Sequence, residues 1–274
     1  MRLRSGTAVV LVLSLSAAML GRIRHLACVR PLGGACELIV VRHGETEWNR
    51  ALRVQGSTDI ELNAKGRIQA DRCAAALAKQ LALDSRPKVV LSSELGRAAV
   101  TAASIALALS EGAGASTTVR QDPRLNEWDL GVLEGLRKEE AAKEHPEDWR
   151  LFSEHWSVPR VSPEVAATRI AGGESMREVR ARAVAALEEA CREAQAEGML
   201  VIAVTHGGVL GQLLQHTVEI GTVSADISTA PANACISRFL VTPDGRWEVT
   251  SWSEIDHLDG DAAPHTVNYN KVAS

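Results

Sequence analysis

The chain has 274 residues, a length that suits one large α/β domain or two small ones. Its composition, 46% apolar and 23% charged, argues against a disordered, collagen-like or polytopic membrane protein. The formal charge of −4 at pH 7 argues against a general nucleic-acid binder, which would show a basic excess.

Residues 1–36 differ in charge from the rest of the chain, because they contain five arginines and no acidic side chain. Thr7 to Leu20 form a mostly apolar run of 14 residues, shorter than the roughly 17–25 that a membrane-spanning helix needs. This pattern is typical of a secretory signal peptide, and the arginine-rich continuation fits a chloroplast or mitochondrial transit peptide about as well. We therefore expect residues 1–36 to be a targeting leader outside the fold. If these residues do not direct the protein to an organelle or to secretion, we expect the protein to be cytoplasmic.

Residues 37–274 hold 25 basic and 34 acidic side chains, a formal charge of −9, and alternate apolar runs with amphipathic ones. Strands are expected over 37–41, 88–91, 117–120 and 199–204, and a closing hairpin over 233–241 and 246–252. Helices are expected over 63–83, 94–109 and 175–196, and from Gly208 to about 220. Two further short helices, split by Pro146, are expected before irregular chain at Pro159 and Pro163. This alternation predicts a largely parallel sheet with helices on both faces.

Three of the expected strands end in polar, reactive residues. These are Arg42-His43-Gly44, Ser92-Ser93 with Arg97 one helical turn on, and Thr205-His206-Gly207. Because ligands of open α/β sheets bind beyond the carboxyl ends of the strands, we expect two arginines and two histidines to converge there. Arginine binds phosphate bidentately and an imidazole can be a nucleophile, so this set predicts a phosphate-sized site. Glu127 is a candidate acid, but on spacing alone it is one of 34 acidic residues.

The ordered motifs carry a family resemblance. The run Arg42-His43-Gly44-Glu45-Thr46-Glu47-Trp48-Asn49 resembles the signature of the histidine phosphatase (phosphoglycerate mutase-like) superfamily. The later blocks follow in the family's order: Gln55-Gly56, Ser92 to Ala98, Leu125-Asn126-Glu127, Glu134-Gly135, Gly173-Glu174-Ser175 and Val204 to Gly207. The set spans about residues 37–253, and it is most similar to plant-type, metal-independent phosphatases, some of which act on phosphoserine.

The resemblance implies a three-layer α/β/α sandwich with a mainly parallel central sheet. It places the histidine phosphatase domain at 37–257, with a cap-like insertion at 137–172 and a C-terminal tail at 258–274. By the same resemblance His43 is the nucleophile, and Glu127 protonates the leaving oxygen and then activates water. The residues expected to bind the substrate are Arg42, Asn49, Gln55, Gly56, Arg97, Glu127, His206 and Gly207. Among these, Arg42, Arg97 and His206 are also counted as catalytic, since they would hold the transferring phosphoryl group.

The implied partner is a small phosphomonoester, with no nucleic acid, no membrane span in the mature protein, no metal and no cofactor. The five scattered cysteines contain no CxxC pair and predict neither a disulfide framework nor a zinc site. His145, His155 and His216 are expected to be structural or on the surface. Trp128 and Trp156 could line the substrate side or pack the cap.

Two alternatives remain open. A cofactor-dependent phosphoglycerate mutase uses the same catalytic residues, but mutases carry basic and tyrosyl residues after the acid, where this chain has Trp128-Asp129. A non-catalytic phosphate-binding protein built on the same fold is the other alternative, and it is disfavoured because all five core residues are present.

Overall fold

The fold is described by a computed structural model that covers residues 34–112, 116–157, 161–220 and 230–264. The leader expected over 1–36 therefore lies outside the described residues, apart from its last three. Of these, Cys36 is already the first residue of a strand. Among the described residues, no helix combines the length and the apolar character needed to cross a bilayer.

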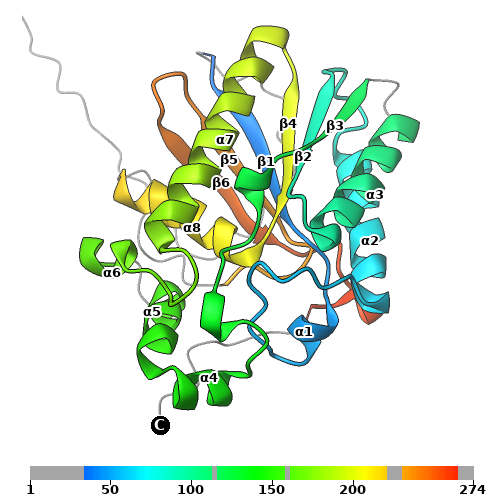
Figure 1. The fold of residues 1–274 in the computed structure, drawn as a ribbon. Helices are drawn as coiled ribbons and strands as arrows, with labels where there is room; N and C mark the ends of the chain where they lie inside the picture. Colours follow the sequence, from blue (N-terminus) through cyan, green and yellow to red (C-terminus); the bar gives the residue numbers. More distant parts are fainter. Residues whose placement is uncertain (1–33, 113–115, 158–160, 221–229, 265–274) are drawn as a thin grey trace, which may run out of the picture. The chain divides into compact units, whose positions relative to one another are not determined.

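A six-stranded sheet forms the centre of the described fold (Figure 1). Its strands, in the order in which they lie side by side, are β3 (Thr117–Gln121), β2 (Lys88–Ser92), β4 (Leu200–Thr205), β1 (Cys36–Arg42), β5 (Ile236–Val241) and β6 (Trp247–Glu254). The first four are parallel, whereas β5 is antiparallel to both β1 and β6. The mainly parallel sheet and the closing hairpin expected from the sequence are confirmed.

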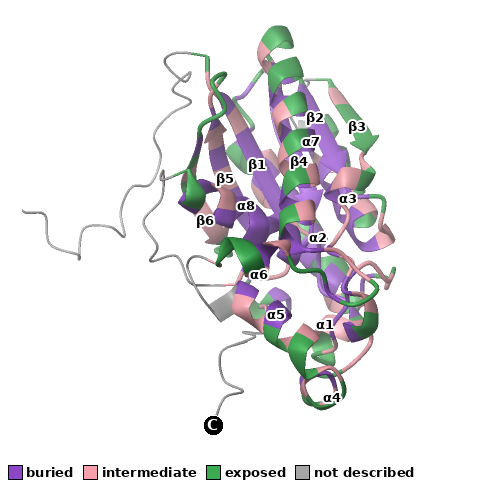
Figure 2. Cartoon of the chain, turned by 60° about the vertical axis from the view of Figure 1, so that its left-hand side comes forward, coloured by how far each residue is buried: buried purple, intermediate pink, exposed green. Residues whose placement is uncertain are grey.

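Helices cover both faces of this sheet. α2 (Ala64–Gln80) and α3 (Gly96–Gly112) pack on one face, and α7 (Met176–Glu197) and α8 (Gly207–Glu219) on the other. Alternate residues of β1 point to opposite faces of the sheet. Leu38 and Val40 pack in the core under α7 and α8, whereas Ile39 and Val41 pack in the core under α2 and α3. Successive strand residues point to opposite faces, so a strand buried on both sides is apolar throughout. Figure 2 shows β1, β2 and β4 buried in this way, and the three-layer prediction is confirmed.

Local capping sets where two of the long amphipathic helices, α2 and α7, begin. The Asn63 side chain accepts a hydrogen bond from the Gly66 amide at the start of α2 (2.8 Å). Ser175 begins α7 in a capping box with Glu178, and α7 ends at Gly198, whose φ of +66° suits glycine. Such caps satisfy amides that the first turn leaves without a partner, so these boundaries follow from the sequence.

Three short helices lie beyond the carboxyl ends of the parallel strands (Figure 1). They are α4 (Lys138–Glu144), α5 (Pro146–Ser157) and α6 (Pro163–Ala167). The two helices split by Pro146 are confirmed. The irregular chain expected at Pro163 is wrong, because Ser162 caps a short helix there and proline is favoured in a first turn. Pro159 lies outside the described residues.

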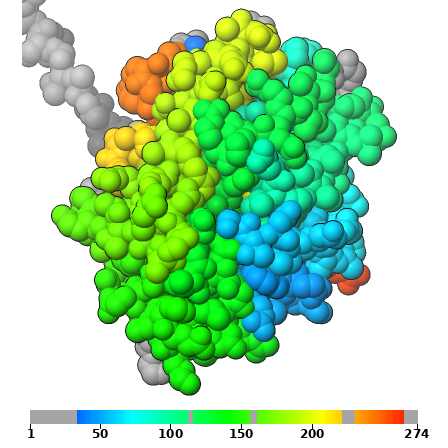
Figure 3. Space-filling view, in the orientation of Figure 1, coloured from blue at the N-terminus to red at the C-terminus, as the bar shows by residue number. Residues whose placement is uncertain are grey.

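The segment after β1 was not expected to be helical. It forms α1 (Glu47–Arg50), a single turn closed by a capping box between Thr46 and Asn49. Four residues are too few to show a helical period, which explains why the sequence pattern does not reveal it. Arg53, just after α1, donates to the Gly135 carbonyl (2.5 Å), and Figure 3 shows the segments around residues 50 and 140 side by side.

Candidate active site

The ends of β1, β2 and β4 meet as the sequence predicts. Arg42 pairs with Thr205 in the parallel register, and the amide of His43 continues the ladder by donating to the Thr205 carbonyl (3.0 Å). The amide of Ser93 donates to the Val204 carbonyl in the same way (3.0 Å). As a result the rings of His43 and His206 lie with their centroids 5.0 Å apart, at the edge of the sheet where ligands of this fold class bind.

His43 is buried and has a defined orientation. Its Nδ1 lies 2.7 Å from the Gly44 carbonyl oxygen, and because a carbonyl only accepts, Nδ1 carries the proton. The lone pair therefore lies on Nε2. Burial, together with the charges of Arg97 and Arg42, lowers the pKa of His43 well below its usual value. The ring is a neutral imidazole, which is the form that can act as a nucleophile.

Arg97 is a fully buried cation in the first turn of α3. Its Nη1 donates to the Thr58 carbonyl (2.8 Å) and its Nη2 to the Gly56 carbonyl (2.7 Å). Burial lowers the pKa of Arg97 to about 10, so the side chain stays charged at neutral pH. With its amide oxygen toward Arg97, Gln55 accepts from Nε (2.6 Å) and its nitrogen donates to Thr46 Oγ1 (2.5 Å). The expected residues Gln55 and Gly56 therefore lie directly beside Arg97.

Glu134 holds the loop that orients Arg97. Its Oε1 accepts from the Ser57 amide (2.7 Å) and its Oε2 from the Thr58 amide (2.9 Å). Gly56 has φ +58°, and a Cβ there would collide with the Glu134 carboxylate. Glycine is needed at this position for both reasons. Glu134 belongs to one of the motifs of the family resemblance but was not among the expected site residues.

His206 is the buried N-cap residue of α8. Its Nε2 lies 2.7 Å from Ser93 Oγ, which in turn lies 2.8 Å from Asn126 Oδ1, and its Nδ1 lies 3.3 Å from Arg97 Nε. Burial, followed by the charge of Arg97, lowers the pKa of His206 well below its usual value. Both ring nitrogens face protein groups, so His206 would bind a phosphoryl oxygen only by exchanging one of these contacts.

Arg42 has a donor that no described residue uses. Its Nη1 donates to the Pro231 carbonyl (2.7 Å), whereas its buried Nε has no hydrogen-bond partner among the described residues. A Cβ on Gly207 would lie 3.2 Å from the guanidinium carbon, so the glycine leaves room for Arg42 against the start of α8. A buried donor without a partner is costly, and an anion at this position would satisfy it.

Glu127 joins the same cluster from a distant part of the chain. Its Oε2 accepts from the Gly208 amide (3.1 Å) and its Oε1 from the Trp128 amide (2.9 Å). A Cβ on Gly208 would lie 2.5 Å from Glu127 Oε1, so the carboxylate occupies the space that glycine leaves at the N-terminus of α8. The structure thereby brings to the site the acid that spacing alone could not single out.

Asn49 is linked to the backbone of His43 through Asn233, which was not among the expected site residues. Its Oδ1 accepts from the Thr46 amide (3.2 Å) and from Nδ2 of Asn233 (3.0 Å). Asn233 also donates to the His43 carbonyl (3.2 Å) and so connects α1 to the backbone of His43. No local signal marks Asn233, because it lies in a turn before β5 and its partners are about 190 residues away in the sequence.

The remaining histidines and tryptophans have packing contacts. Buried His155 lies 2.8 Å from Gln212 Nε2 through its Nδ1 and packs edge-on against Trp128, with ring centroids 5.5 Å apart. Trp128 is buried and donates to the Glu174 carbonyl (2.8 Å), so it packs the cap. His216 is half-buried against the ring of Trp247. The side chain of Trp156 lies outside the described residues.

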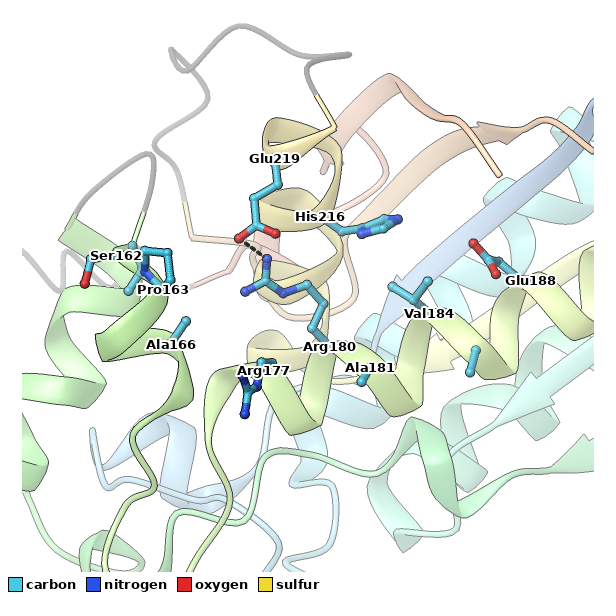
Figure 4. A pocket seen from close by; sticks show the side chains of 12 residues that line it. Ser162, Pro163, Ala166, Arg177, Arg180, Ala181, Val184, Glu188, His216 and Glu219 are labelled. Atoms are coloured by element: carbon cyan, nitrogen blue, oxygen red, sulfur yellow. Dashed lines mark ion pairs between the residues drawn. The ribbon is translucent and has the colours of Figure 1, made fainter. Parts of the chain in front are cut away.

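A cavity of about 880 Å³ lies between α6, α7 and α8 and holds none of the expected site residues. Its lining is mostly apolar, with Val184 and Pro163 among the contributors, and Figure 4 shows Arg180 of α7 paired with Glu219 of α8 at its side. This cavity is separate from the cluster formed by Arg42, His43, Arg97, Glu127 and His206. Over the described ranges, no group of three or more histidine, cysteine or acidic side chains could hold a metal ion.

The chain is similar to known proteins in sequence and in fold. The profile described as histidine phosphatase superfamily (branch 1) matches residues 38–255. A metal-independent phosphoserine phosphatase of Arabidopsis thaliana is 33% identical over 238 residues, which cover 83% of this chain and 90% of that protein. A probable phosphoglycerate mutase GpmB of Escherichia coli is 34% identical over 82% of this chain and 96% of its own.

Solved structures are also similar to this chain in fold. A mycobacterial glucosyl-3-phosphoglycerate phosphatase superposes with a TM-score of 0.65 at 27% identity, over 81% of this chain and all of that one. YhfR of Bacillus stearothermophilus superposes with a TM-score of 0.63 at 28% identity. Since the profile covers most of the chain and the motif residues converge on one edge of the sheet, this protein belongs to the histidine phosphatase superfamily.

Proposed function

We propose that this protein hydrolyses phosphomonoesters by transferring the phosphoryl group first to Nε2 of His43 and then to water. The observation that carries the proposal is the state of His43: a buried, neutral imidazole whose Nδ1 is bound to the Gly44 carbonyl, beside two arginines. A neutral Nε2 next to fixed cations is what attack on a dianionic phosphate requires.

In the first step Nε2 of His43 forms a bond to phosphorus as the ester oxygen leaves on the opposite side. Phosphoryl transfer passes through a loose transition state, so positioning and charge stabilisation dominate, and Arg42 and Arg97 supply both. Glu127 gives its proton to the departing alkoxide. In the second step water attacks the phosphorus of phosphohistidine and the Glu127 carboxylate takes a proton from that water. The bond between Nε2 and phosphorus breaks, which releases phosphate and restores the neutral imidazole. Acid–base assistance of this kind contributes about 10²–10⁴-fold in rate.

The substrate class is inferred from the charges of the cluster and from the relatives. Arg42, Arg97 and the two histidines form a site for one phosphate group. Two of the relatives named above are a phosphoserine phosphatase and a glucosyl-3-phosphoglycerate phosphatase. The substrate of this chain is therefore a small phosphorylated metabolite, with phosphoserine and sugar or glycerate phosphates as the candidates.

The test is to trap the phosphoenzyme. Wild-type protein mixed with ³²P-labelled substrate and quenched rapidly should carry label that is acid-labile and base-stable, as phosphohistidine is. His43→Ala should carry no label and release no phosphate, while His145→Ala, a half-exposed histidine of the cap, should behave as wild type. Acid-stable label, or undiminished turnover in His43→Ala, would contradict the assignment. Binding of phosphomonoesters without turnover would indicate the non-catalytic alternative.

A phosphoglycerate mutase is the second candidate, because one relative is named a probable phosphoglycerate mutase. Mutases of the family follow the acid with basic and tyrosyl residues, whereas here Trp128 follows Glu127 and is buried against Phe152 and His155. Neither Trp128 nor Asp129 supplies a cation for a substrate carboxylate. Incubation with 3-phosphoglycerate distinguishes the two: we expect phosphate release, and isomer interconversion without release would favour the mutase.

A further inference from the structure

Arg182 of α7 binds the turn that carries Glu127. Its Nη1 donates to the carbonyls of Arg124 (2.8 Å) and Asn126 (2.6 Å), and its Nη2 donates to the carbonyl of Glu127 itself (3.0 Å). One guanidinium therefore holds three backbone carbonyls within four residues. The planar, five-donor fork of arginine suits such a contact, which a lysine ammonium could make only in part.

Glu174 fixes Arg182 from the other side and extends the contact past Glu127. Its carboxylate accepts from Nε (2.9 Å) and Nη2 (2.8 Å) of Arg182, and its Oε2 also accepts from the Asp129 amide (3.1 Å). The Glu174 carbonyl accepts from the indole of Trp128 (2.8 Å). Arg182 and Glu174 together hold the backbone on both sides of the acid.

This pair is more shielded than an ordinary surface ion pair. The side chains of Arg182 and Glu174 are 20% and 25% exposed, and both partners have further hydrogen bonds to the backbone. Bidentate, charge-assisted hydrogen bonds are roughly twice as strong as neutral ones, and shielding from water preserves them. The arrangement is therefore strong enough to determine where the 124–129 turn lies.

The position of that turn decides where the Glu127 carboxylate points. Both of its oxygens accept backbone amides, from Trp128 on the turn and Gly208 on α8. If the turn moved, the carboxylate would lose one of these donors. We propose that Arg182, held by Glu174, is a positioning residue that places Glu127 for proton transfer to the leaving group. The proposal rests on the proposed function, because it presupposes that Glu127 is the acid.

The test separates proton transfer from every other step by the choice of leaving group. An alkyl phosphate such as phosphoserine needs a proton on its departing oxygen, whereas 4-nitrophenolate leaves without one. In Arg182→Gln we expect kcat/KM for the best alkyl phosphate substrate to fall about 10²-fold, the scale of a 1 Å misplacement. For 4-nitrophenyl phosphate kcat/KM should remain nearly unchanged, since kcat/KM reports only the steps up to departure of the leaving group.

Three further variants make the result decisive. Arg182→Lys should recover part of the alkyl phosphate activity, and Glu174→Gln should show the same leaving-group dependence in a milder form. Arg192→Gln removes an arginine that pairs with Glu188 on the same helix, and it should behave as wild type on both substrates. An equal loss on both substrates in a folded Arg182→Gln, or no loss on the alkyl phosphate, would overturn the proposal. Failure of the wild type to form phosphohistidine would overturn the proposed function instead.

Discussion

At the scale of single residues, the site combines a neutral imidazole with two permanent cations. Burial is the largest reason why the pKa of His43 is low, and the charges of Arg97 and Arg42 add to it. Lowering the pKa of a histidine extends the neutral form to more acidic solution, so His43 keeps its lone pair below pH 6.5. The pKa of Arg97 is also lowered, to about 10, and at that value the side chain stays charged. The neutral imidazole of His43 and the charged guanidinium of Arg97 therefore coexist over the whole neutral pH range.

His155 links folding stability to pH. Burial lowers the pKa of His155 to about 3, with a further contribution from the charge of Arg180. Between about pH 6.5 and 3 the unfolded chain binds a proton that the folded chain does not, so this contribution to stability is complete above pH 6.5 and falls as the pH drops. From pH 7 to pH 5 the wild type should therefore lose about 2 kcal/mol more of its unfolding free energy than His155→Gln. Urea denaturation at both pH values measures this, and parallel losses would contradict the prediction.

At the scale of elements, the start of α8 organises much of the site. Its N-cap is His206, its first residue leaves space for Arg42, and its second donates an amide to Glu127. A helix N-terminus offers free amides and a partial positive charge, which favour a carboxylate or a phosphate nearby. Three of the expected site residues therefore depend on a single turn of helix.

Gly208→Ala tests this dependence. The new Cβ would lie 2.5 Å from Glu127 Oε1 and displace the carboxylate, so kcat/KM for an alkyl phosphate should fall by about 10²-fold. Stability should be maintained, because alanine is favoured over glycine within a helix by up to about 1 kcal/mol. Steady-state kinetics and thermal unfolding on one preparation check both parts. A variant that is destabilised and fully active would show that Glu127 does not need this space.

At the scale of the whole molecule, the net charge and the local charge have opposite signs. Residues 37–274 carry a formal charge of −9, yet Arg42 and Arg97 lie together where the substrate phosphate is proposed to bind. The net negative charge of residues 37–274 does not attract anions, so phosphate binding depends on cations held inside the protein. Carbonyls of the 56–58 loop and of Pro231 hold these arginines in place.

Residues 1–33 lie outside the described residues, and their composition remains the basis for expecting a targeting leader. The contacts of the site described above involve residues 42–233. We therefore predict that a chain lacking residues 1–33 keeps the kcat/KM and the unfolding free energy of the full chain. N-terminal sequencing of the protein from its native cell tests removal of the leader. An intact Met1, or loss of activity on truncation, would contradict this interpretation.

The sequence by itself determined the sheet and the convergence of two arginines and two histidines at the ends of its strands. Strand runs such as 200–205, helix caps such as Ser175 and the polar residues after β1, β2 and β4 are local signals. Because parallel strands end at one edge, those signals also predicted that His43 and His206 would meet. The sequence missed α1 and α6, whose few residues show no period.

Only the tertiary structure decided which further groups complete the site. Glu127 was named through the resemblance, but its place beside Gly208, 81 residues away, depends on how the 124–129 turn packs against α7 and α8. Asn233, Glu134 and Arg182 act through hydrogen bonds that span 55 to 190 residues of sequence. Periodicity and turn chemistry describe a few neighbouring residues, whereas these contacts exist only once the layers have packed, which is the physical reason why the sequence could not predict them.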